Sequence, residues 1–189
     1  MTALRDDVRA GRSALWANPA YTPAADPVAR ADLDRARADW DMLAPLLARL
    51  FPELEASGGR VTSDLIPAPA GAFGDPAGTL LIKGDHALPV AGSIKARGGL
   101  FEVFMCAVTQ ARAAGVLTPD APVTDLANMR DFFAARTIAV GSTGNLGLSV
   151  GIAARALGYA CVVHMSSDAK PWKVDRLRKL GVEVVLHTA

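Results

Sequence analysis

Cysteine and histidine are scarce in this sequence, and their scarcity argues against two kinds of site. Only Cys106 and Cys161 are present, with three histidines among the 189 residues. Each cysteine stands among apolar neighbours, which predicts two buried, reduced thiols rather than a disulfide. Because no histidine has cysteine partners at the spacing of a zinc site, we also expect no bound metal. Reduced thiols of this kind are typical of a cytoplasmic protein.

An excess of charge and a long hydrophobic run are also missing. The 20 basic and 19 acidic residues give a net charge of +1, so no overall field would attract nucleic acid or an anionic membrane surface. No apolar run approaches the roughly 20 residues that cross a bilayer, and the charged N-terminus does not resemble a signal peptide. The composition, 51% hydrophobic and 21% charged, is that of a soluble globular protein. We therefore expect a cytoplasmic protein that binds neither nucleic acid nor membrane.

The first third of the chain predicts an arm and one helix. Proline-containing turn signals favour an irregular arm over residues 1–25. Asp26 and Pro27 are typical of an N-cap and a first helical position, so the helix should begin there. Apolar residues then recur at three- and four-residue steps, although Pro45 should kink the helix. The residues on this apolar face are Leu33, Ala36, Trp40, Leu43, Leu47 and Leu50.

The middle of the chain predicts a surface segment, a short strand and a second helix. Residues 51–77 are rich in glycine, proline and serine, so they should wrap over the surface. The segment Thr79–Lys83 has the residues of a strand. Ser93 then predicts the N-cap of a helix over residues 94–114, which Gly115 ends.

The last third predicts an α/β fold, because short apolar strands alternate there with helices. The expected strands cover residues 137–140, 160–164 and 182–186, and the expected helices cover residues 145–157 and 171–180. Strands joined by helices form a parallel sheet, which we expect to be covered by helices on both faces. The chain ends directly after the last strand, so the sheet looks unfinished and the sequence predicts part of a longer protein.

A lysine beside a pair of glycines is the first candidate for chemistry. Lys95 lies in the first turn of the expected helix, within Gly92-Ser93-Ile94-Lys95-Ala96-Arg97-Gly98-Gly99. The positive end of a helix, combined with burial, favours a neutral and nucleophilic amine that can attack an aldehyde. Two glycines cost roughly 1 kcal/mol each inside a helix, which predicts that a backbone or a flat ring lies close to them. The alternative is an ordinary solvated lysine, with the glycines breaking the helix.

A glycine-rich turn is the second candidate. The string Gly141-Ser142-Thr143-Gly144-Asn145-Leu146-Gly147 joins an expected strand to an expected helix. Backbone N–H groups converge at such a turn, and the helix dipole favours an anion there, either a carboxylate or a phosphate. The side chain of Asn145 could also bond to a ring oxygen. An ordinary strand–helix turn needs glycine as well, so the pattern alone does not identify the anion.

Two other motifs fit the same region poorly. The string Gly147-Leu148-Ser149-Val150-Gly151 has the spacing of a serine-hydrolase nucleophile, but Ser149 falls inside the helix rather than on the turn. The glycines of the turn do not follow the order of a dinucleotide-binding loop. The next strand also lacks an acidic residue at its end, since Asp168 comes after it. A hydrolase and a nicotinamide-dependent dehydrogenase are both disfavoured.

Taken together, the lysine motif and the glycine-rich turn resemble the fold-type II enzymes that depend on pyridoxal 5'-phosphate (PLP). The longer strings Leu88–Gly99 and Ile138–Ser149 resemble the D-serine dehydratases within that family. Further similarities keep the family's order along most of the chain. They are Trp16-Ala17-Asn18-Pro19, Phe51-Pro52-Glu53 with Gly58-Gly59, and Val163-His164-Met165-Ser166 with Trp172-Lys173. The resemblance implies an α/β fold of the tryptophan synthase β type, with helices flanking a parallel sheet.

The resemblance also implies a role for each motif residue. Lys95 would bind the PLP cofactor covalently and then transfer protons. Ser142, Thr143 and the backbone of Gly144 would bind the carboxylate of the amino acid substrate. Asn145 would form a hydrogen bond with the ring hydroxyl of the cofactor. The implied reaction is the β-elimination of D-serine to pyruvate and ammonia, with the cofactor as electron sink.

The same resemblance places other parts of such an enzyme outside this sequence. It assigns residues 1–78 to the larger domain and residues 79–189 to the smaller α/β domain. The glycine-rich phosphate cup and the group facing the pyridine nitrogen would follow Ala189, so these residues alone should show little activity. L-serine or threonine is an alternative substrate. A non-catalytic α/β module is the alternative in which the chain is not an enzyme. Monomer and homo-oligomer are both open.

Overall fold

The computed structural model describes residues 2–22, 28–71, 74 and 78–188, and the chain falls into two compact units, residues 1–34 and 35–189. In the first unit, Thr2–Arg9 forms helix α1, so the prediction of an irregular arm is wrong for that segment. The predicted helix start at Asp26 and Pro27 lies outside the described residues.

Helix α2 (Arg30–Leu50) continues through the proline that was expected to kink it. Pro45 is exposed, so water can solvate the carbonyl group that loses its helical partner. The predicted apolar face is confirmed at Leu43 and Leu47, which are fully buried. At the other end of the helix, Leu33 is 42% exposed, so the predicted face does not extend that far.

Two short strands form an antiparallel pair. Strand β1 (Leu65–Pro67) pairs with strand β2 (Leu81–Lys83), with Ile66 opposite Ile82. The sequence predicts β2 within Thr79–Lys83, but β1 lies in the segment expected to be a surface wrap. Both strands are exposed along their whole length, so no alternation of apolar and polar residues marks β1 in the sequence.

The last third of the chain forms the predicted parallel sheet. Its strands are β3 (Thr137–Gly141), β4 (Ala160–Ser166) and β5 (Glu183–His187), in the order β3-β4-β5. Helix α5 (Asn145–Leu157) joins β3 to β4, and helix α6 (Pro171–Lys179) joins β4 to β5. The α/β prediction is confirmed, and the observed bounds of α5 are the predicted ones.

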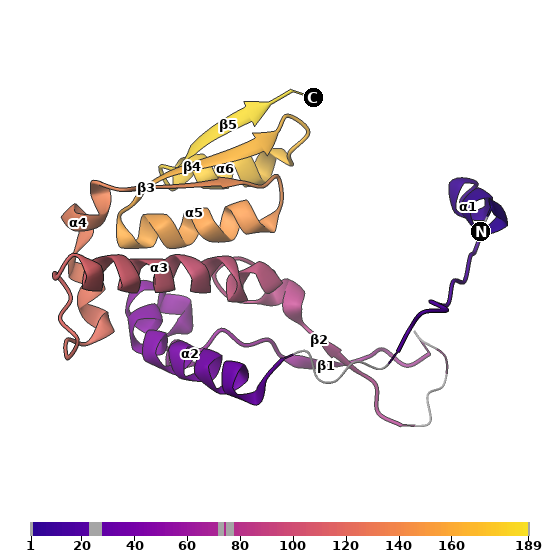
Figure 1. The fold of residues 1–189 in the computed structure, drawn as a ribbon, viewed down its shortest axis with the longest axis horizontal. Helices are drawn as coiled ribbons and strands as arrows, with labels where there is room; N and C mark the ends of the chain where they lie inside the picture. The colour runs from indigo at the N-terminus through magenta and orange to yellow at the C-terminus, as the bar shows by residue number, and fades with distance from the viewer. Residues whose placement is uncertain (1, 23–27, 72–73, 75–77, 189) are drawn as a thin grey trace. The chain divides into compact units, whose positions relative to one another are not determined.

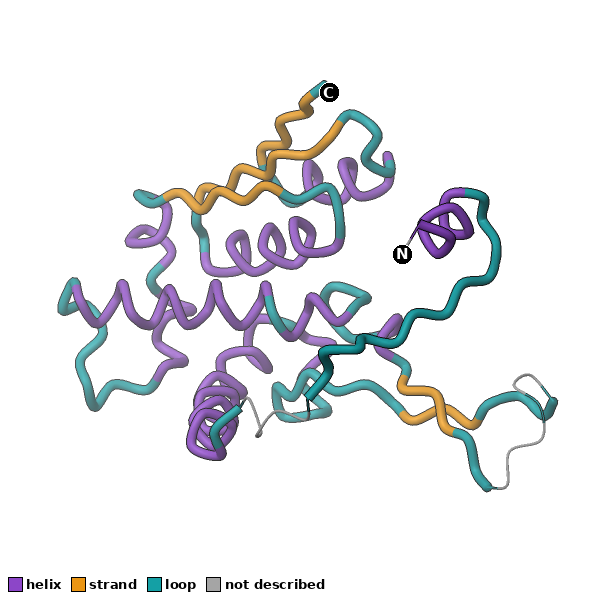
Figure 2. Tube along the Cα trace, turned by 45° about the vertical axis from the view of Figure 1, so that its right-hand side comes forward, coloured by secondary structure: helices purple, strands orange, loops and turns teal. Residues whose placement is uncertain are grey.

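Both crossover helices cover the same face of this sheet, as Figures 1 and 2 show. Parallel crossovers are right-handed, so two that move in the same direction across a sheet place their helices on one side. Along β4, Cys161, Val163 and Met165 are buried on the helix side, whereas Ala160 and His164 point to the other face and are exposed. The prediction that helices cover both faces is therefore wrong for the described part of the chain.

Helix α3 (Gly99–Ala113) packs on α5, and α2 lies beyond α3 (Figure 1). The largest fully buried side chains include Phe104 of α3, Phe133 and Tyr159. The rings of Phe133 and Tyr159 lie 4.7 Å apart between centroids. The remaining elements are short: helix α4 (Arg130–Ala134) and the 3-10 helices η1 (Pro52–Leu54), η2 (Asp85–Ala87), η3 (Ile94–Arg97) and η4 (Val123–Asn128). One core therefore joins α2, α3, α5 and the sheet.

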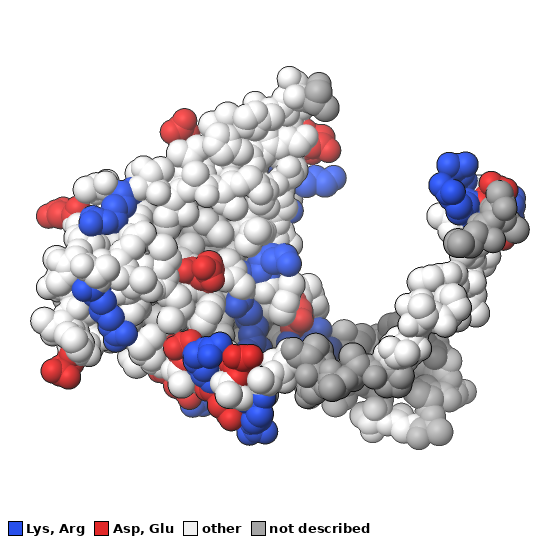
Figure 3. Space-filling model, in the orientation of Figure 1, with Lys and Arg blue, Asp and Glu red and all other residues white. Residues whose placement is uncertain are grey.

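The described residues also show how surface charges, thiols and possible metal ligands are arranged. Basic and acidic side chains are interspersed on the face of the second unit that Figure 3 shows. Helices long and apolar enough to span a bilayer are not found among the residues that the structure describes. Both cysteines are free thiols, and Cys161 is buried as the sequence predicts, whereas Cys106 is only partly buried. Within the described residues, no three His, Cys, Asp or Glu side chains group as metal ligands would.

Candidate active site

Lys95 lies on the 3-10 helix η3 rather than in the first turn of a long α-helix. The helix predicted over residues 94–114 is divided at Gly98, and α3 begins only after it. As predicted, Ser93 is the N-cap, because its hydroxyl oxygen accepts a hydrogen bond of 3.3 Å from the backbone N–H of Lys95. Gly115, at φ +70°, follows the end of α3 as expected. The lysine is thus held on a tight turn that leads into α3.

A buried serine connects this turn to α5. Ser149 is fully buried, and its hydroxyl donates a hydrogen bond of 2.7 Å to the carbonyl oxygen of Lys95. Ser149 lies within α5, away from the strand–helix turn where a hydrolase nucleophile would lie. Its hydroxyl has a backbone partner in this position, which argues further against the hydrolase interpretation.

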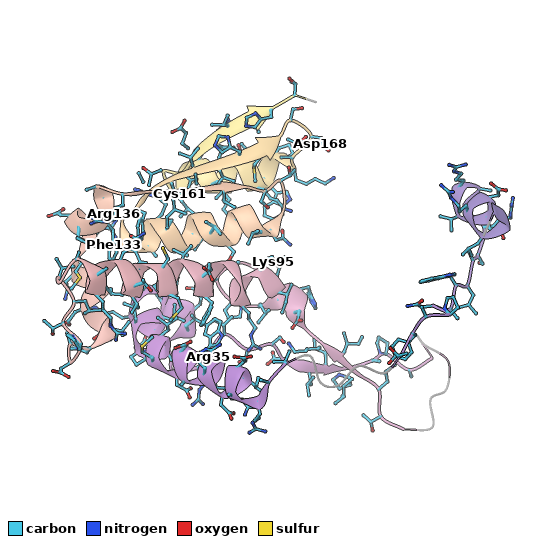
Figure 4. All side chains as sticks on the ribbon, viewed as in Figure 1. Arg35, Lys95, Phe133, Arg136, Cys161 and Asp168 are labelled. Carbon is cyan, nitrogen blue, oxygen red and sulfur yellow. The ribbon has the colours of Figure 1, made fainter. Side chains whose placement is uncertain are left out.

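Lys95 lines a cavity of ≈ 450 Å³ between α3, β3 and α5. The walls are mainly apolar, with Val103, Val140 and Leu146 among them, and Glu102 adds a carboxylate. A cavity of this size and character is typical of a site for a small molecule. The lysine side chain is exposed, so the expected burial is wrong for this residue. Figure 4 shows Lys95 at the end of α3 on the same side of the fold as Asp168, which follows β4.

The two glycines next to this lysine have different surroundings. A Cβ atom on Gly99 would lie 3.1 Å from Leu146 Cδ1 and 3.1 Å from Ser149 Oγ, so this glycine allows α3 to pack closely on α5. A Cβ atom on Gly98 would have nothing within 4 Å, and Gly98 lines the cavity of Lys95. The atoms that come close to Gly99 are side-chain atoms of Leu146 and Ser149 and not the predicted backbone or ring, whereas Gly98 leaves room in the cavity.

The glycine-rich turn ends in the N-terminus of α5, which lacks a side-chain cap. Gly144 is the N-cap residue and offers no side-chain hydrogen bond, and the first turn contains no acidic residue. The first N–H groups of a helix have no partner within the helix, so those of Asn145 and its neighbours are available to an anion. A Cβ atom on Gly147 would lie 2.7 Å from the carbonyl oxygen of Ser142, so this glycine lets the turn close.

Two hydroxyl groups of the turn accept backbone hydrogen bonds. Ser142 Oγ accepts a hydrogen bond of 3.3 Å from the N–H of Gly144. Thr143 Oγ1 accepts one of 3.0 Å from the N–H of Ser166, at the end of β4. Each hydroxyl retains its own hydrogen, which can be donated to a ligand. The turn is therefore ordered by contacts that leave donors for an anion.

A second cavity of ≈ 450 Å³ lies at the carboxyl ends of the strands. It is lined by Ser142 and Thr143 of the turn and by His164 and His187 of neighbouring strands. The two histidines are linked, with His164 Nδ1 2.9 Å from His187 Nε2. Sequence reasoning did not select these histidines. Their positions at the ends of adjacent parallel strands, where ligands bind in such sheets, were the signal that could have identified them.

Lys95 and the glycine-rich turn line two separate cavities whose walls include consecutive residues of β3. Val140 lines the cavity of Lys95, and the next residue, Gly141, lines the cavity of the turn. Leu146, in the first turn of α5, also lines the cavity of Lys95. Both motifs are thus attached to α5, Lys95 through the hydrogen bond of Ser149 and the glycine-rich turn through the N-terminus of the helix.

The groups with shifted pKa values lie elsewhere. Burial raises the pKa of Tyr159 to about 12 and that of Cys161 to about 11. Hydrogen bonds from Lys83 and then Ser63 hold the pKa of Asp85 below its usual value. None of these three titrating groups lines either cavity, so they belong to the core and to the β2 region.

Comparison with known proteins identifies related sequences over nearly the whole chain. The family described as "Pyridoxal-phosphate dependent enzyme" matches residues 58–189, which include both motifs. A probable D-serine dehydratase of Rhizobium etli is 54% identical over 98% of this chain. Those of Sinorhizobium medicae and Hahella chejuensis are 51% and 47% identical over 98% and 100% of it. The chain spans only 44–46% of the length of these three relatives. The resemblance expected from the motifs is confirmed.

Solved structures share the fold. Diaminopropionate ammonia lyase of Escherichia coli, in its apo form, matches with a TM-score of 0.57 at 18% identity, over 80% of this chain and 38% of that one. A pyridoxal 5'-phosphate-dependent aspartate racemase matches with a TM-score of 0.54 at 17% identity, over 87% of this chain and 39% of that one. At these identities the matches concern the fold alone, and they confirm the predicted fold-type II architecture.

Proposed function

The chain belongs to the family of pyridoxal-phosphate dependent enzymes, and we propose that it carries the cofactor lysine and the carboxylate-binding turn of a D-serine ammonia-lyase. The reaction is the β-elimination of D-serine to pyruvate and ammonia in the cytoplasm. The observation that carries this proposal is the 54% identity to a probable D-serine dehydratase over 98% of the chain. Within this proposal, residues 1–78 belong to the larger domain and residues 79–189 to the smaller one.

The residues around the two cavities fit such a cofactor. Lys95 provides an amine on a cavity of ≈ 450 Å³ with mainly apolar walls, where a flat ring can lie. Gly98 leaves open space there, since a Cβ atom at that position would meet nothing within 4 Å. When bound, PLP supplies an electron sink for the charge that develops at the substrate Cα. Asn145, the first residue of α5, would hold the ring hydroxyl through its side-chain amide.

Lys95 has two tasks in this proposal. Its amine would hold the cofactor through a covalent bond and would also serve as the base that takes the proton from the substrate Cα. Both tasks require a mobile amine on a fixed backbone. The hydrogen bonds of the Lys95 backbone to Ser93 and Ser149 support this combination, because they fix the turn and leave the side chain free to move.

The glycine-rich turn would bind the substrate carboxylate. The hydroxyl groups of Ser142 and Thr143 and the backbone N–H of Gly144 are the proposed donors, and the Gly144 N–H would exchange its 3.3 Å bond to Ser142 Oγ for the carboxylate. The uncapped N-terminus of α5 adds the favourable end of a helix dipole and N–H groups without helical partners. Binding here would hold the substrate Cα between the turn and Lys95, which is the geometry that proton removal requires.

A lyase for another hydroxy amino acid is the second candidate. The donors of the turn recognise an α-carboxylate, which D-serine, L-serine and threonine share. The wall of the Lys95 cavity is mainly apolar, so it does not by itself select the D- over the L-form of the substrate. Release of pyruvate or 2-oxobutyrate from D- and L-serine and D- and L-threonine separates these substrates.

The test uses the protein expressed from its complete reading frame, mixed with PLP. Reduction with borohydride followed by peptide mass analysis should locate the cofactor on Lys95, and D-serine should yield pyruvate. Lys95→Ala should abolish both the visible absorbance of lysine-bound PLP and pyruvate formation. Lys173→Ala is the matched control, because Lys173 stacks near the ring of Trp172 and lines neither cavity. Cofactor bound equally well to the Lys95→Ala protein would refute the assignment.

A further inference from the structure

Val90 has a backbone conformation that β-branched residues rarely adopt. Its φ is +73°, and no other non-glycine residue in the described part of the chain has a positive φ. The N–H of Ala91 donates a hydrogen bond of 2.9 Å to the carbonyl oxygen of Pro89. Val90 is therefore the central residue of a three-residue turn of the rarer, positive-φ kind, which is strained. Such a conformation persists only where the surrounding structure holds it.

Two contacts hold this turn in place. The side chain of Val90 is 6% exposed and belongs to the hydrophobic core. The guanidinium group of Arg176 donates a hydrogen bond of 2.9 Å from Nη2 to the carbonyl oxygen of Val90. Arg176 lies on α6, so the bond connects the strained turn to the crossover helix between β4 and β5. Because the donor is charged, this hydrogen bond is stronger than one between two neutral groups.

The strained turn leads directly into the turn that carries Lys95. The N–H of Gly92 donates a hydrogen bond of 2.9 Å to the carbonyl oxygen of Leu88, and Ser93 then caps the N–H of Lys95. The residues between Val90 and Lys95 are thus fixed by short-range hydrogen bonds. A displacement of the Val90 carbonyl group would pass along them to Lys95.

We propose that Arg176 is a positioning residue, which holds the strained Val90 turn and thereby places the Lys95 amine in its cavity. The inference rests on the proposed role of Lys95 in cofactor binding. Arg176 does not line the cavity of Lys95, so it acts through the backbone of Val90 and not on the cofactor. Ser149 holds the same lysine turn from α5, at the carbonyl oxygen of Lys95. The segment from Val90 to Lys95 is therefore bonded to α6 at its first residue and to α5 at its last.

Hydrogen–deuterium exchange of the cofactor-free protein tests the positioning role directly. Arg176→Met should speed exchange of the backbone amides of residues 88–97 by roughly tenfold, while exchange in β4 stays unchanged. Arg176→Lys keeps a charged donor and should recover most of the protection. Arg155→Met is the matched control, because Arg155 also binds backbone carbonyl groups, those of Tyr159 and Leu180, but none in the lysine turn.

The second measurement is the rate at which PLP becomes attached to Lys95, trapped by borohydride and expressed per folded molecule of the complete protein. Arg176→Met should lower this rate by about tenfold, and Arg176→Lys and Arg155→Met should stay within about threefold of the parent. If Arg176→Met does not fold, Arg176→Gln takes its place in both measurements, with Arg155→Gln as its control, because glutamine is too short to reach the carbonyl oxygen of Val90 as the guanidinium does.

Three outcomes have distinct meanings. Faster exchange over residues 88–97 together with slower trapping in Arg176→Met, but not in Arg155→Met, supports the positioning role. Equal effects of the two arginine substitutions, or no effect of either, overturn it. Cofactor trapped at other lysines in the parent protein refutes the proposed function instead, and the exchange measurement then still decides whether Arg176 holds the turn.

Discussion

The hydroxyl group of Ser149 donates a hydrogen bond of 2.7 Å to the carbonyl oxygen of Lys95. That carbonyl oxygen also accepts a bond of 3.2 Å from the N–H of Gly98, so the lysine turn is fixed both within itself and to α5. Because α5 begins at the glycine-rich turn, one helix orients both parts of the candidate site. Ser149 therefore connects the lysine turn with the carboxylate-binding turn through the packing of α5.

Ser149→Ala should destabilise the fold by about 1 kcal/mol, because a buried hydrogen bond is lost while the carbonyl oxygen of Lys95 keeps its second donor. The measurement is urea unfolding, in which the midpoint should fall and the slope stay unchanged. Ser167→Ala is the control, since Ser167 is exposed and its substitution should change stability by less than about 0.5 kcal/mol. Equal midpoints for the two variants would contradict the role assigned to Ser149.

Substitution of the two adjacent glycines should separate packing from cofactor binding. Gly99→Ala places a methyl group 3.1 Å from atoms of Leu146 and Ser149, so it should cost about 1–3 kcal/mol of stability through overpacking. Gly98→Ala meets no atom within 4 Å and should change stability by about 0.5 kcal/mol or less.

The order of these two variants should reverse when the attachment of PLP is measured instead of stability. The methyl group of Gly98→Ala would occupy the cavity of Lys95, so PLP should attach more weakly although the fold remains stable. Unfolding midpoints and borohydride trapping, both measured on each variant, check this. A Gly98→Ala protein that binds PLP as the parent does would show that the open space beside Gly98 is not used.

The α/β part of the fold follows from the sequence because its signals are local. The apolar runs of β3 to β5 and the helix between Gly144 and Gly158 are bounded by residues whose backbone preferences end an element, and Gly158 has a φ of +102°. Helix α2 is predicted from the recurrence of its apolar residues at three- and four-residue steps. The sequence did not predict that one face of the described sheet lacks a helix. Both helices lie on one side because the two crossovers run in the same direction across the sheet, and no single residue determines that direction.

The candidate site is predictable only in part. Lys95 and the glycine-rich turn are found from sequence because each has a recognisable string of glycines and polar residues. The break at Gly98, the exposure of Lys95 and the pairing of His164 with His187 depend on contacts between segments distant in sequence. Strand β1 was missed because its three residues are exposed and lack alternation.

Substitution of Thr143 should distinguish its structural contact from its proposed contact with substrate. Thr143→Val removes the acceptor of the Ser166 N–H, so it should cost about 1 kcal/mol of stability as well as raise the KM for D-serine in the complete protein. Thr143→Ser keeps the hydroxyl group and should preserve both properties. A Thr143→Val protein with lower stability but an unchanged KM would confine the residue to a structural role.

The buried thiol of Cys161 should make the fold sensitive to alkaline pH. Burial raises its pKa from 9.0 to about 11, against a smaller opposing effect of Arg155, so the folded protein keeps the thiol protonated where the unfolded chain has lost the proton. The unfolded state then binds fewer protons, and the free energy of unfolding must fall as pH rises from 9 towards 11. Below pH 9 this contribution to stability is fully present.

The pH at which the free energy of unfolding begins to fall identifies the titrating group responsible. Burial also raises the pKa of Tyr159, from 10.0 to about 12, so its own contribution is lost only as pH rises above 10. In Cys161→Ala the free energy of unfolding should therefore stay level up to about pH 10 and fall only beyond it, whereas the parent falls from about pH 9. Urea midpoints across this range, with Cys106→Ala as the control at a partly buried thiol, measure the difference. The same onset in the parent and in Cys161→Ala would mean that the thiol of Cys161 ionises as freely in the fold as in the unfolded chain.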